Sequence, residues 1–355
     1  MEPVTHFLAG AVLSRCGFNR KTAYSTLAMT LAAEAPDLDV LWSVRGPVAA
    51  LQHHRGWTHT LAGAPVVAAA VVGVVWLFDT WRRRRGKTIS EKGPPARWGL
   101  LWLFSMVAVF SHILLDYTNN YGVRPFFPFQ PKWYAGNVFF IFEPLVFLLL
   151  LAALVMPSLF ALADSEVGAR RQRFRGRGWA IFAMMGIVLL AGFRIWERET
   201  ARRIVEMEMA EESNGPVVKM SLSPYPVNPF QWHAVVETPL LFQIAAVDTR
   251  EVDGESFVSN PEEDIFYKPP VTPALQAAKA SRLGKVYLDW SQFPLVREVE
   301  GDVASQETVV QFDDLRFYYD VSFFHGREDH PLGGQVTLNR RNQVVAMELN
   351  GHEQK

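Results

Sequence analysis

The sequence contains a single cysteine, Cys16, and has a net charge of only -1. A lone cysteine excludes a disulfide-stapled scaffold, because there is no second thiol in the chain with which it could pair. A mean hydropathy of +0.05 excludes a disordered chain and also a protein that lies wholly within the membrane. The basic runs flank apolar segments, as they do in membrane proteins, so nucleic acid is not expected as a partner.

The near-neutral total conceals two different halves. Residues 1–196 carry 20 Lys and Arg against 10 Asp and Glu, whereas residues 197–355 carry 15 against 26. A bilayer core needs about 20 apolar helical residues to span it. The first half has a weaker apolar run at 22–44, a shorter one at HFLAGAVL that cannot span alone, and long runs at 61–78, 98–115, 138–163 and 179–196. We therefore expect an α-helical polytopic membrane domain of about five or six helices over residues 1–196.

The orientation of these helices follows from the basic loops. The loops 82–97 and 164–178 carry 12 of the 20 basic residues of this half, so both are expected on the cytoplasmic side. The other helix ends, and everything after residue 196, then face outward from a bacterial cytoplasmic (inner) membrane. The N-terminus lacks the basic region and cleavage-site pattern of a signal peptide, so we expect it to be retained.

The ionisable side chains of the first half gather at the outward ends of the apolar runs. Charged groups at membrane depth are costly and need partners, so a convergent set of them is a functional hypothesis. Five of the nine histidines of the chain belong to this set, together with three aspartates. The set is His6, Asp37, Asp39, His53, His54, Arg55, His59, His112 and Asp116, with Glu143 about one turn inside its run.

The spacing within this set brings donor atoms together. His112 and Asp116 are four residues apart at the end of an apolar helix, which places both side chains on one face. Pro36 disfavours helical geometry at the residue before it, so we expect the helix to break just ahead of Asp37 and Asp39. Broken backbone at membrane depth is tolerated where it lines a cavity.

The chemistry of the set indicates a metal centre, since imidazole and carboxylate together suit zinc, or manganese. Roughly three to six of these groups would hold one or more divalent ions, with one coordination position left open to water. Asp37 or Asp39 would bridge metals or act as the general base. Arg55 would bind an anionic oxygen of the substrate, because its planar guanidinium matches phosphate geometry.

Four separated segments carry a family resemblance: THFLAGAVL, APDLDVL, HHRGWTHT and HILLDYTNNYG, in this order within about the first 150 residues. In these segments the chain resembles the membrane-bound metal-dependent hydrolase family that includes YdjM-like inner-membrane proteins, a family itself similar to zinc-dependent phospholipase C. The resemblance implies a metal-dependent hydrolase and, by analogy with phospholipase C, cleavage of a phosphoester. The metal ligands that it implies are His6, Asp37, Asp39, His53, His54, His59, His112 and Asp116.

The second half reads as a soluble α+β or barrel-type domain rich in antiparallel strands, over residues 197–355. A charged helix is expected to continue or leave the last apolar run, and the proline-rich stretch 253–283 is expected to be loop with a short helix at ALQAAKASRLG. No nucleophile elbow, glycine-rich phosphate loop or Cys/His cluster occurs in this half. Strands are predicted at VVKMSLS, FQWHAVVET, LLFQIAAVDT, KVYLDWSQF and TVVQFDDLRFYYDVSFF, and a hairpin at QVTLNRRNQVVAMEL.

The sequence therefore favours a membrane-bound metal-dependent hydrolase acting on a phosphoester of a lipid or lipid-linked molecule at the outer face of the membrane. Membrane lipids are the expected partners, and the second domain is available to an envelope protein. The alternative is a non-catalytic membrane scaffold with a structural metal site and a partner-binding β domain. An ion or proton transporter is a weaker third hypothesis, because the charges gather at one face instead of crossing the bilayer.

Overall fold

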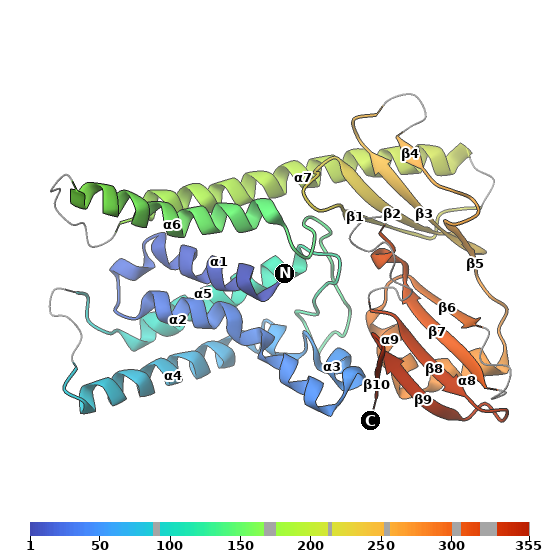
Figure 1. The fold of residues 1–355 in the computed structure, drawn as a ribbon, viewed down its shortest axis with the longest axis horizontal. Helices are drawn as coiled ribbons and strands as arrows, with labels where there is room; N and C mark the ends of the chain where they lie inside the picture. The colour runs from blue at the N-terminus through green and yellow to red at the C-terminus, as the bar shows by residue number, and fades with distance from the viewer. Residues whose placement is uncertain are drawn as a thin grey trace. The chain divides into compact units, whose positions relative to one another are not determined.

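The computed structural model describes residues 1–87, 93–166, 175–211, 215–251, 256–299, 307–319 and 332–354 (Figure 1). Two compact units result: Met1–Asp39 with Arg55–Ile195, and Val40–His54 with Trp196–Lys355. Parts of the predicted loops 82–97 and 164–178 lie outside the described residues, as do His325 and His330.

The first unit is helical. Its apolar runs form α4 (Ala64–Arg84), α5 (Trp98–Tyr117), α6 (Pro144–Glu166) and α7 (Arg177–Glu211), and these four helices are long and apolar enough to cross a membrane. Two shorter helices precede them, α1 (Pro3–Arg15) and α2 (Ser25–Glu34). Because α1 and α2 have 13 and 10 residues, neither is long enough to span alone, and the expected count of five or six membrane helices is not confirmed.

The short helices pack closely against each other and against the spans. A Cβ atom at Gly10 of α1 would lie 2.6 Å from the backbone oxygen of Met29 and 2.7 Å from Cβ of Ala33, so only glycine permits this approach to α2. One hydrophobic cluster joins α1 to α6 and α7, and another joins α2 to α4 and α5. The C-terminal ends of α1, α4 and α6 lie at the same end of this unit as the N-terminal ends of α2, α5 and α7 (Figure 1).

The α-helix ends close to Pro36, as the sequence predicts. α2 ends at Glu34, and a 3₁₀ helix, η2 (Ala35–Arg45), follows it directly. A short turn η1 (Phe18–Arg20) connects α1 with α2, and another, η3 (Trp57–His59), precedes α4. The first residues of η2, up to Asp39, and the whole of η3 lie at the end of the first unit where α5 ends, so Asp37 and His59 can meet the side chains of α5.

The second unit contains two antiparallel sheets. The first has strand order β1-β2-β3-β4, with β5 also paired to β3, and the second has the order β10-β9-β8-β7-β6. The hairpin predicted around NRRNQ is confirmed as β8 and β9. The strands are β1 (Lys219–Pro224), β2 (Gln231–Glu237), β3 (Leu241–Asp248), β4 (Phe257–Val258), β5 (Ile265–Tyr267), β6 (Pro294–Val299), β7 (Thr308–Asp314), β8 (Gly334–Leu338), β9 (Val344–Leu349) and β10 (His352–Glu353).

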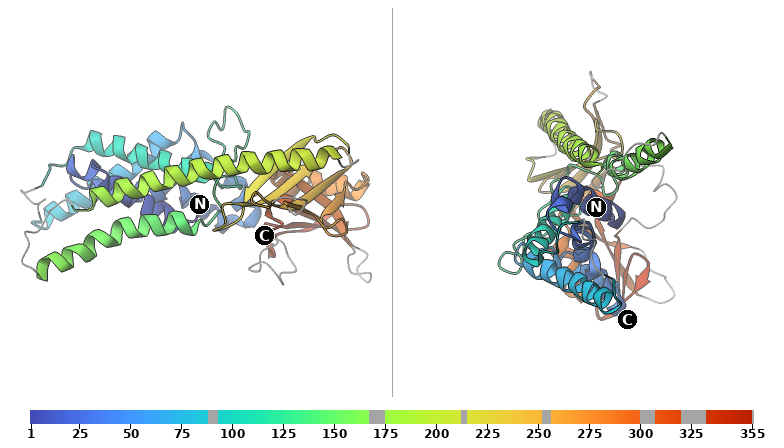
Figure 2. Two further views of the ribbon diagram at one scale, coloured as in Figure 1. Left: turned by 90° about the horizontal axis from the view of Figure 1, so that it is seen from above. Right: turned by 90° about the vertical axis from the view of Figure 1, so that its left-hand side faces the viewer.

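The strand predicted at KVYLDWSQF is wrong, because most of this segment is helical. Two short helices, α8 (Pro273–Ala280) and α9 (Arg282–Trp290), follow each other here. α9 buries Leu283, Tyr287 and Trp290, which recur at the three- and four-residue spacing of a helix face. The charged continuation of the last span is confirmed, since α7 runs unbroken from Arg177 to Glu211 (Figure 2).

The segment 40–54 leaves the helical half and packs within the second unit. Its helix α3 (Pro47–His53) contacts α9 and β9. The side-chain amide of Gln354 donates to the carbonyl oxygen of Arg45 at 3.0 Å and accepts from the backbone N–H of Val48 at 3.0 Å. This segment therefore belongs to the second unit although the residues on either side of it belong to the first.

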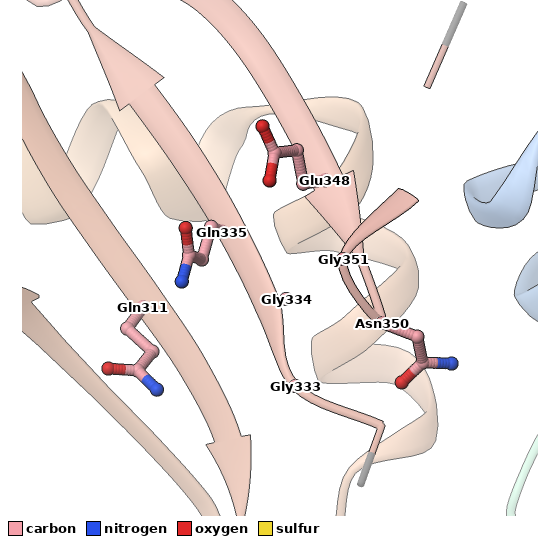
Figure 3. A pocket seen from close by; sticks show the side chains of 7 residues that line it. All are labelled: Gln311, Gly333, Gly334, Gln335, Glu348, Asn350 and Gly351. Atoms are coloured by element: carbon pink, nitrogen blue, oxygen red, sulfur yellow. The ribbon is translucent and has the colours of Figure 1, made fainter. Parts of the chain in front are cut away.

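A small polar cavity of about 100 Å³ lies on the second sheet (Figure 3). Side chains of Gln311, Gln335 and Glu348 reach it from the neighbouring strands β7, β8 and β9, and Gly333 and Asn350 complete its rim with two further glycines. Glu348 is the one carboxylate among the residues that line this cavity, and a single carboxylate does not make a set of metal ligands.

Candidate metal centre

Four of the predicted ligands converge at one end of the first unit. Asp37 comes from η2, His59 from η3, and His112 and Asp116 from the last two turns of α5. One potential ligand atom from each residue lies within 4.8 Å of those of the other three. His59, His112 and Asp116 are fully buried, whereas the Asp37 side chain is 19% exposed and forms the accessible edge of the group.

The spacing of the ligand atoms suits a cation with tetrahedral coordination. Nε2 of His59 lies 3.4 Å from an oxygen of Asp37, 3.4 Å from an oxygen of Asp116 and 3.0 Å from Nε2 of His112. Nε2 of His112 lies 3.6 Å and 3.4 Å from the same two oxygens. Four ligands at zinc bond lengths of about 2.0–2.1 Å stand about 3.3 Å from one another, so these separations match a single shared ion.

Both imidazoles are turned toward the centre by partners on their other nitrogen. Nδ1 of His112 donates to the backbone carbonyl of Ala33 at 2.7 Å. Nδ1 of His59 lies 3.2 Å from a carboxylate oxygen of Asp39 and 3.0 Å from the hydroxyl of Thr58. A backbone carbonyl or carboxylate behind a ligating histidine is the usual arrangement in metal sites, because it fixes which ring nitrogen carries the proton.

The carboxylates of Asp37, Asp39 and Asp116 concentrate negative charge around His59, so positive charge is favoured there. Burial by itself disfavours the charged imidazolium, but hydrogen bonds to Asp116, Asp37 and Asp39 raise the pKa of His59 to about 10. A proton on His59 supplies this positive charge, and so does a divalent cation bound by the same donors. Oδ2 of Asp116 is buried and lies 3.4 Å from Nε2 of His59 and 3.4 Å from Nε2 of His112, so one cation could contact all three atoms. The residues present therefore fit a divalent metal ion.

Asp116 is held from behind by several positive or polar groups. Its Oδ1 lies 2.9 Å from Nη2 of Arg55 and 3.3 Å from Nε2 of His6, and it also accepts from the α-amino group of Met1. The His6 ring stacks on that of His112, with centroids 3.8 Å apart. His6 therefore lies beside the four-donor group and contacts one of its carboxylates.

Arg55 is buried and engaged, with only 5% of its surface exposed. Besides Asp116, its guanidinium donates to the carbonyl of Gly122 at 2.7 Å and to Oδ1 of Asn119 at 3.3 Å, and it stacks on the ring of Tyr121 at 4.6 Å. These contacts favour a positioning role, in which Arg55 fixes Asp116. Its predicted role as a substrate clamp stays a prediction.

The remaining predicted ligands are not members of the four-donor group. Asp39 lies one layer behind, where its Oδ2 also accepts from the backbone N–H of Arg55 at 2.7 Å. His53 and His54 are not among the residues whose ligand atoms lie within 4.8 Å, and both belong to the segment that packs in the second unit. The His53 ring stacks on Trp42, with centroids 3.9 Å apart.

Some supporting residues have no signal in the sequence. Ala33 contributes only its backbone carbonyl to His112, and Asn119 stands in the turn that follows α5. Its Oδ1 accepts from the backbone N–H of Tyr121 at 3.0 Å, as a turn requires, and also from Arg55. YTNNYG indicates the turn by its composition. Nothing in this segment predicts the hydrogen bond from Arg55 to Asn119.

Comparison with known proteins agrees with this architecture. Residues 1–201, more than half of the chain, match the family described as YdjM inner membrane protein. The chain is also similar to the uncharacterized protein YfhP of Bacillus subtilis (strain 168), with 24% identity over 327 residues that cover 89% of this chain and 87% of that protein. No solved structure matches it significantly. The chain belongs to the YdjM inner membrane protein family.

Proposed function

We propose that this protein is a membrane-bound, metal-dependent hydrolase that cleaves a phosphoester of a lipid or lipid-linked molecule. The observation that carries the proposal is the convergence of Asp37, His59, His112 and Asp116, whose five atom pairs that include a histidine nitrogen are 3.0–3.6 Å apart. The Asp37 side chain keeps this group accessible at one edge. When bound, a divalent ion supplies Lewis-acid activation of water and of a phosphoryl oxygen. Zinc is the ion that this donor set suits best.

Each residue of the group then has a distinct task. His59, His112 and Asp116 are buried and oriented by Asp39, Ala33 and Arg55, so they are suited to hold the ion rigidly. Asp37 lies at the accessible edge, where an incoming water molecule can give up a proton to its carboxylate. We assign the proton-accepting role to Asp37 because Asp39 is already engaged by His59 and by the backbone of Arg55.

The position of the group along the helices supports a lipid substrate. Asp116 is one residue from the end of α5, and His59 lies just before α4 begins, so both are at one end of two apolar spans. Phosphate-bearing headgroups lie at this level of a bilayer. Trp57 of η3 is 60% exposed, and Phe126 and Phe129 in the segment after α5 are 45% and 87% exposed. An exposed tryptophan at the end of a span is typical of the membrane interface.

The test is hydrolysis by the detergent-purified protein of a panel of phospholipids, isoprenoid phosphates and a soluble phosphodiester. We expect zinc-dependent release of product from at least one amphiphilic substrate, lost after chelation and in Asp37→Asn. The double variant His53→Ala/His54→Ala is the matched control, since it alters the same motif outside the four-donor group, and should keep activity. Equal activity in Asp37→Asn and in the wild type would contradict the assignment.

A second function is favoured by one observation, the number of donors. Four protein ligands are enough to close a tetrahedral structural site, whereas a catalytic site keeps a position open. X-ray absorption spectroscopy of the zinc-loaded protein separates the two functions. A zinc ion with an additional oxygen ligand from water supports the hydrolase, and four protein ligands alone support a scaffold whose β-rich unit binds a partner.

A further inference from the structure

A cavity of about 560 Å³ lies at the other end of α1 and α5, away from the metal centre. It is lined by three basic side chains, Arg20, Lys21 and Arg177, and by Phe18, Phe104 and Cys16. Its volume is in the range that takes small organic ligands. None of its lining residues belongs to the four-donor group, so whatever it binds is separate from the proposed hydrolysis.

The rim of this cavity is strongly basic. Arg20, Lys21 and Arg177 are all exposed, and no lining residue is acidic. Nε of Arg177 donates to the backbone carbonyl of Cys16 at 3.1 Å, which fixes the first turn of α7 against the end of α1. Such a concentration of cations attracts an anionic group.

The inner wall of the cavity is apolar. Phe18 and Phe104 meet edge to face with centroids 4.7 Å apart. Phe104 lies six residues after the start of α5, which places it about 9 Å along the helix from the polar end. The cavity therefore runs from a basic rim to an aromatic wall inside an apolar span. A free phosphate ion would use only the rim, whereas an amphiphile with an anionic head would use both.

We propose that this cavity binds the headgroup and the adjoining chain of an anionic phospholipid. The phosphate lies among Arg20, Lys21 and Arg177, and the apolar part passes Phe18 and Phe104. Basic pockets between membrane helices bind anionic headgroups in this way. The site is part of the membrane anchorage of the protein and requires no catalytic activity.

Cys16 provides a direct test, because it is the only cysteine of the chain and lines the cavity. The delipidated full-length protein in neutral detergent is labelled with a maleimide, with phosphatidylglycerol, phosphatidylcholine or inorganic phosphate added. We expect phosphatidylglycerol to slow labelling in a saturable way and the other two to leave it unchanged. Equal protection by phosphatidylcholine, or by inorganic phosphate, would overturn the proposal.

Substitutions test whether phosphatidylglycerol binds in this cavity. Arg20→Gln/Lys21→Gln/Arg177→Gln should bind phosphatidylglycerol roughly a hundredfold more weakly, at about fivefold for each cation. Lys21→Gln alone should show the fivefold change and is the readout if the triple variant folds poorly. The control is Arg82→Gln/Arg84→Gln/Arg85→Gln, which removes the same charge near the same end but outside the cavity. Unchanged binding in the first two variants, or equal losses in the cavity and control triples, would overturn the proposal.

Discussion

Nε2 of His59 and Nε2 of His112 lie 3.0 Å apart, and each is within 3.6 Å of the same oxygen of Asp37. The two imidazoles come from η3 and α5, 53 residues apart in sequence, and each is turned by a different acceptor on Nδ1. Two nitrogen donors that face each other across two carboxylates form a poor hydrophobic core and a good cation site.

Asp39→Ala should weaken zinc affinity by about 10- to 100-fold, because Asp39 orients His59 without belonging to the four-donor group. Competition with a chromophoric chelator on the detergent-purified protein measures the change. Asp248→Ala, at a carboxylate of the β-rich unit paired with Arg250, is the control and should bind zinc as the wild type does. Wild-type affinity in Asp39→Ala would show that the orientation of His59 does not matter.

Arg55→Met should destabilise the metal-free protein by about 3 kcal/mol, because it leaves the buried Asp116 with fewer partners. Zinc supplies positive charge to the same carboxylate, so the loss should shrink when the metal is bound. Thermal unfolding of variant and wild type, each with and without zinc, gives the comparison. A loss of the same size in both states would contradict the role of Arg55 in fixing Asp116.

Glu143 and Arg194 form a second buried pair in the first unit, with 2.9 Å between Oε2 and Nη2 and neither side chain exposed. Either Glu143→Leu or Arg194→Met alone should cost about 3–5 kcal/mol, since each leaves an unpaired buried charge, and the double variant should recover most of the loss. Denaturant titration in detergent tests this double-mutant cycle. The exposed pair Arg202 and Glu206 is the control and should show a coupling below about 0.5 kcal/mol. Additive losses for the buried pair would contradict the pairing.

His233 should make the β-rich unit sensitive to acid. Its Nε2–H donates to the carbonyl of Leu315 at 2.9 Å, and burial lowers the pKa of His233 to about 4, from about 6.5 in the unfolded chain. Between these values the unfolded chain takes up a proton that the folded chain does not. The contribution to stability is therefore complete above pH 6.5 and is lost as the pH falls toward 4.

The expected loss is about 2 kcal/mol between pH 7.5 and pH 5. Denaturant titrations followed by tryptophan fluorescence at the two pH values measure it, and His233→Gln should remove this part of the pH dependence. His352, an exposed histidine of β10, offers the control His352→Gln, which should leave the dependence as in the wild type. The same pH dependence in His233→Gln as in the wild type would rule out this origin.

The sequence predicts where the candidate metal site lies better than it predicts which residues form it. Hydropathy places Asp37, His59 and Asp116 at one end of apolar segments, and residues at one end of a helical bundle are close in space. The motif HHRGWTH does not indicate which of its histidines belongs to the four-donor group. The end of α3 at His53 and the contacts of α3 with α9 and β9 decide this, and those contacts join residues far apart in the sequence.

The β-rich unit shows a similar limit. Most of its predicted strands are confirmed: β1, β2 and β3 lie in the predicted runs within 219–248, and β8 and β9 form the predicted hairpin. The segment KVYLDWSQF is also rich in β-branched and aromatic residues, but Tyr287 and Trp290 share a helix face with Leu283. The pattern of so short a segment does not distinguish a strand from a helix, and packing decides between them.

Metal content is the most direct test of the central claim. Inductively coupled plasma mass spectrometry on the detergent-purified protein should find at least one zinc or manganese ion per chain in the wild type and in His53→Ala/His54→Ala. The double variant Asp37→Ala/His112→Ala should lose it while remaining in the membrane fraction. A wild-type protein that stays folded and empty after metal is added back, or a double variant that keeps full occupancy, would contradict the metal centre.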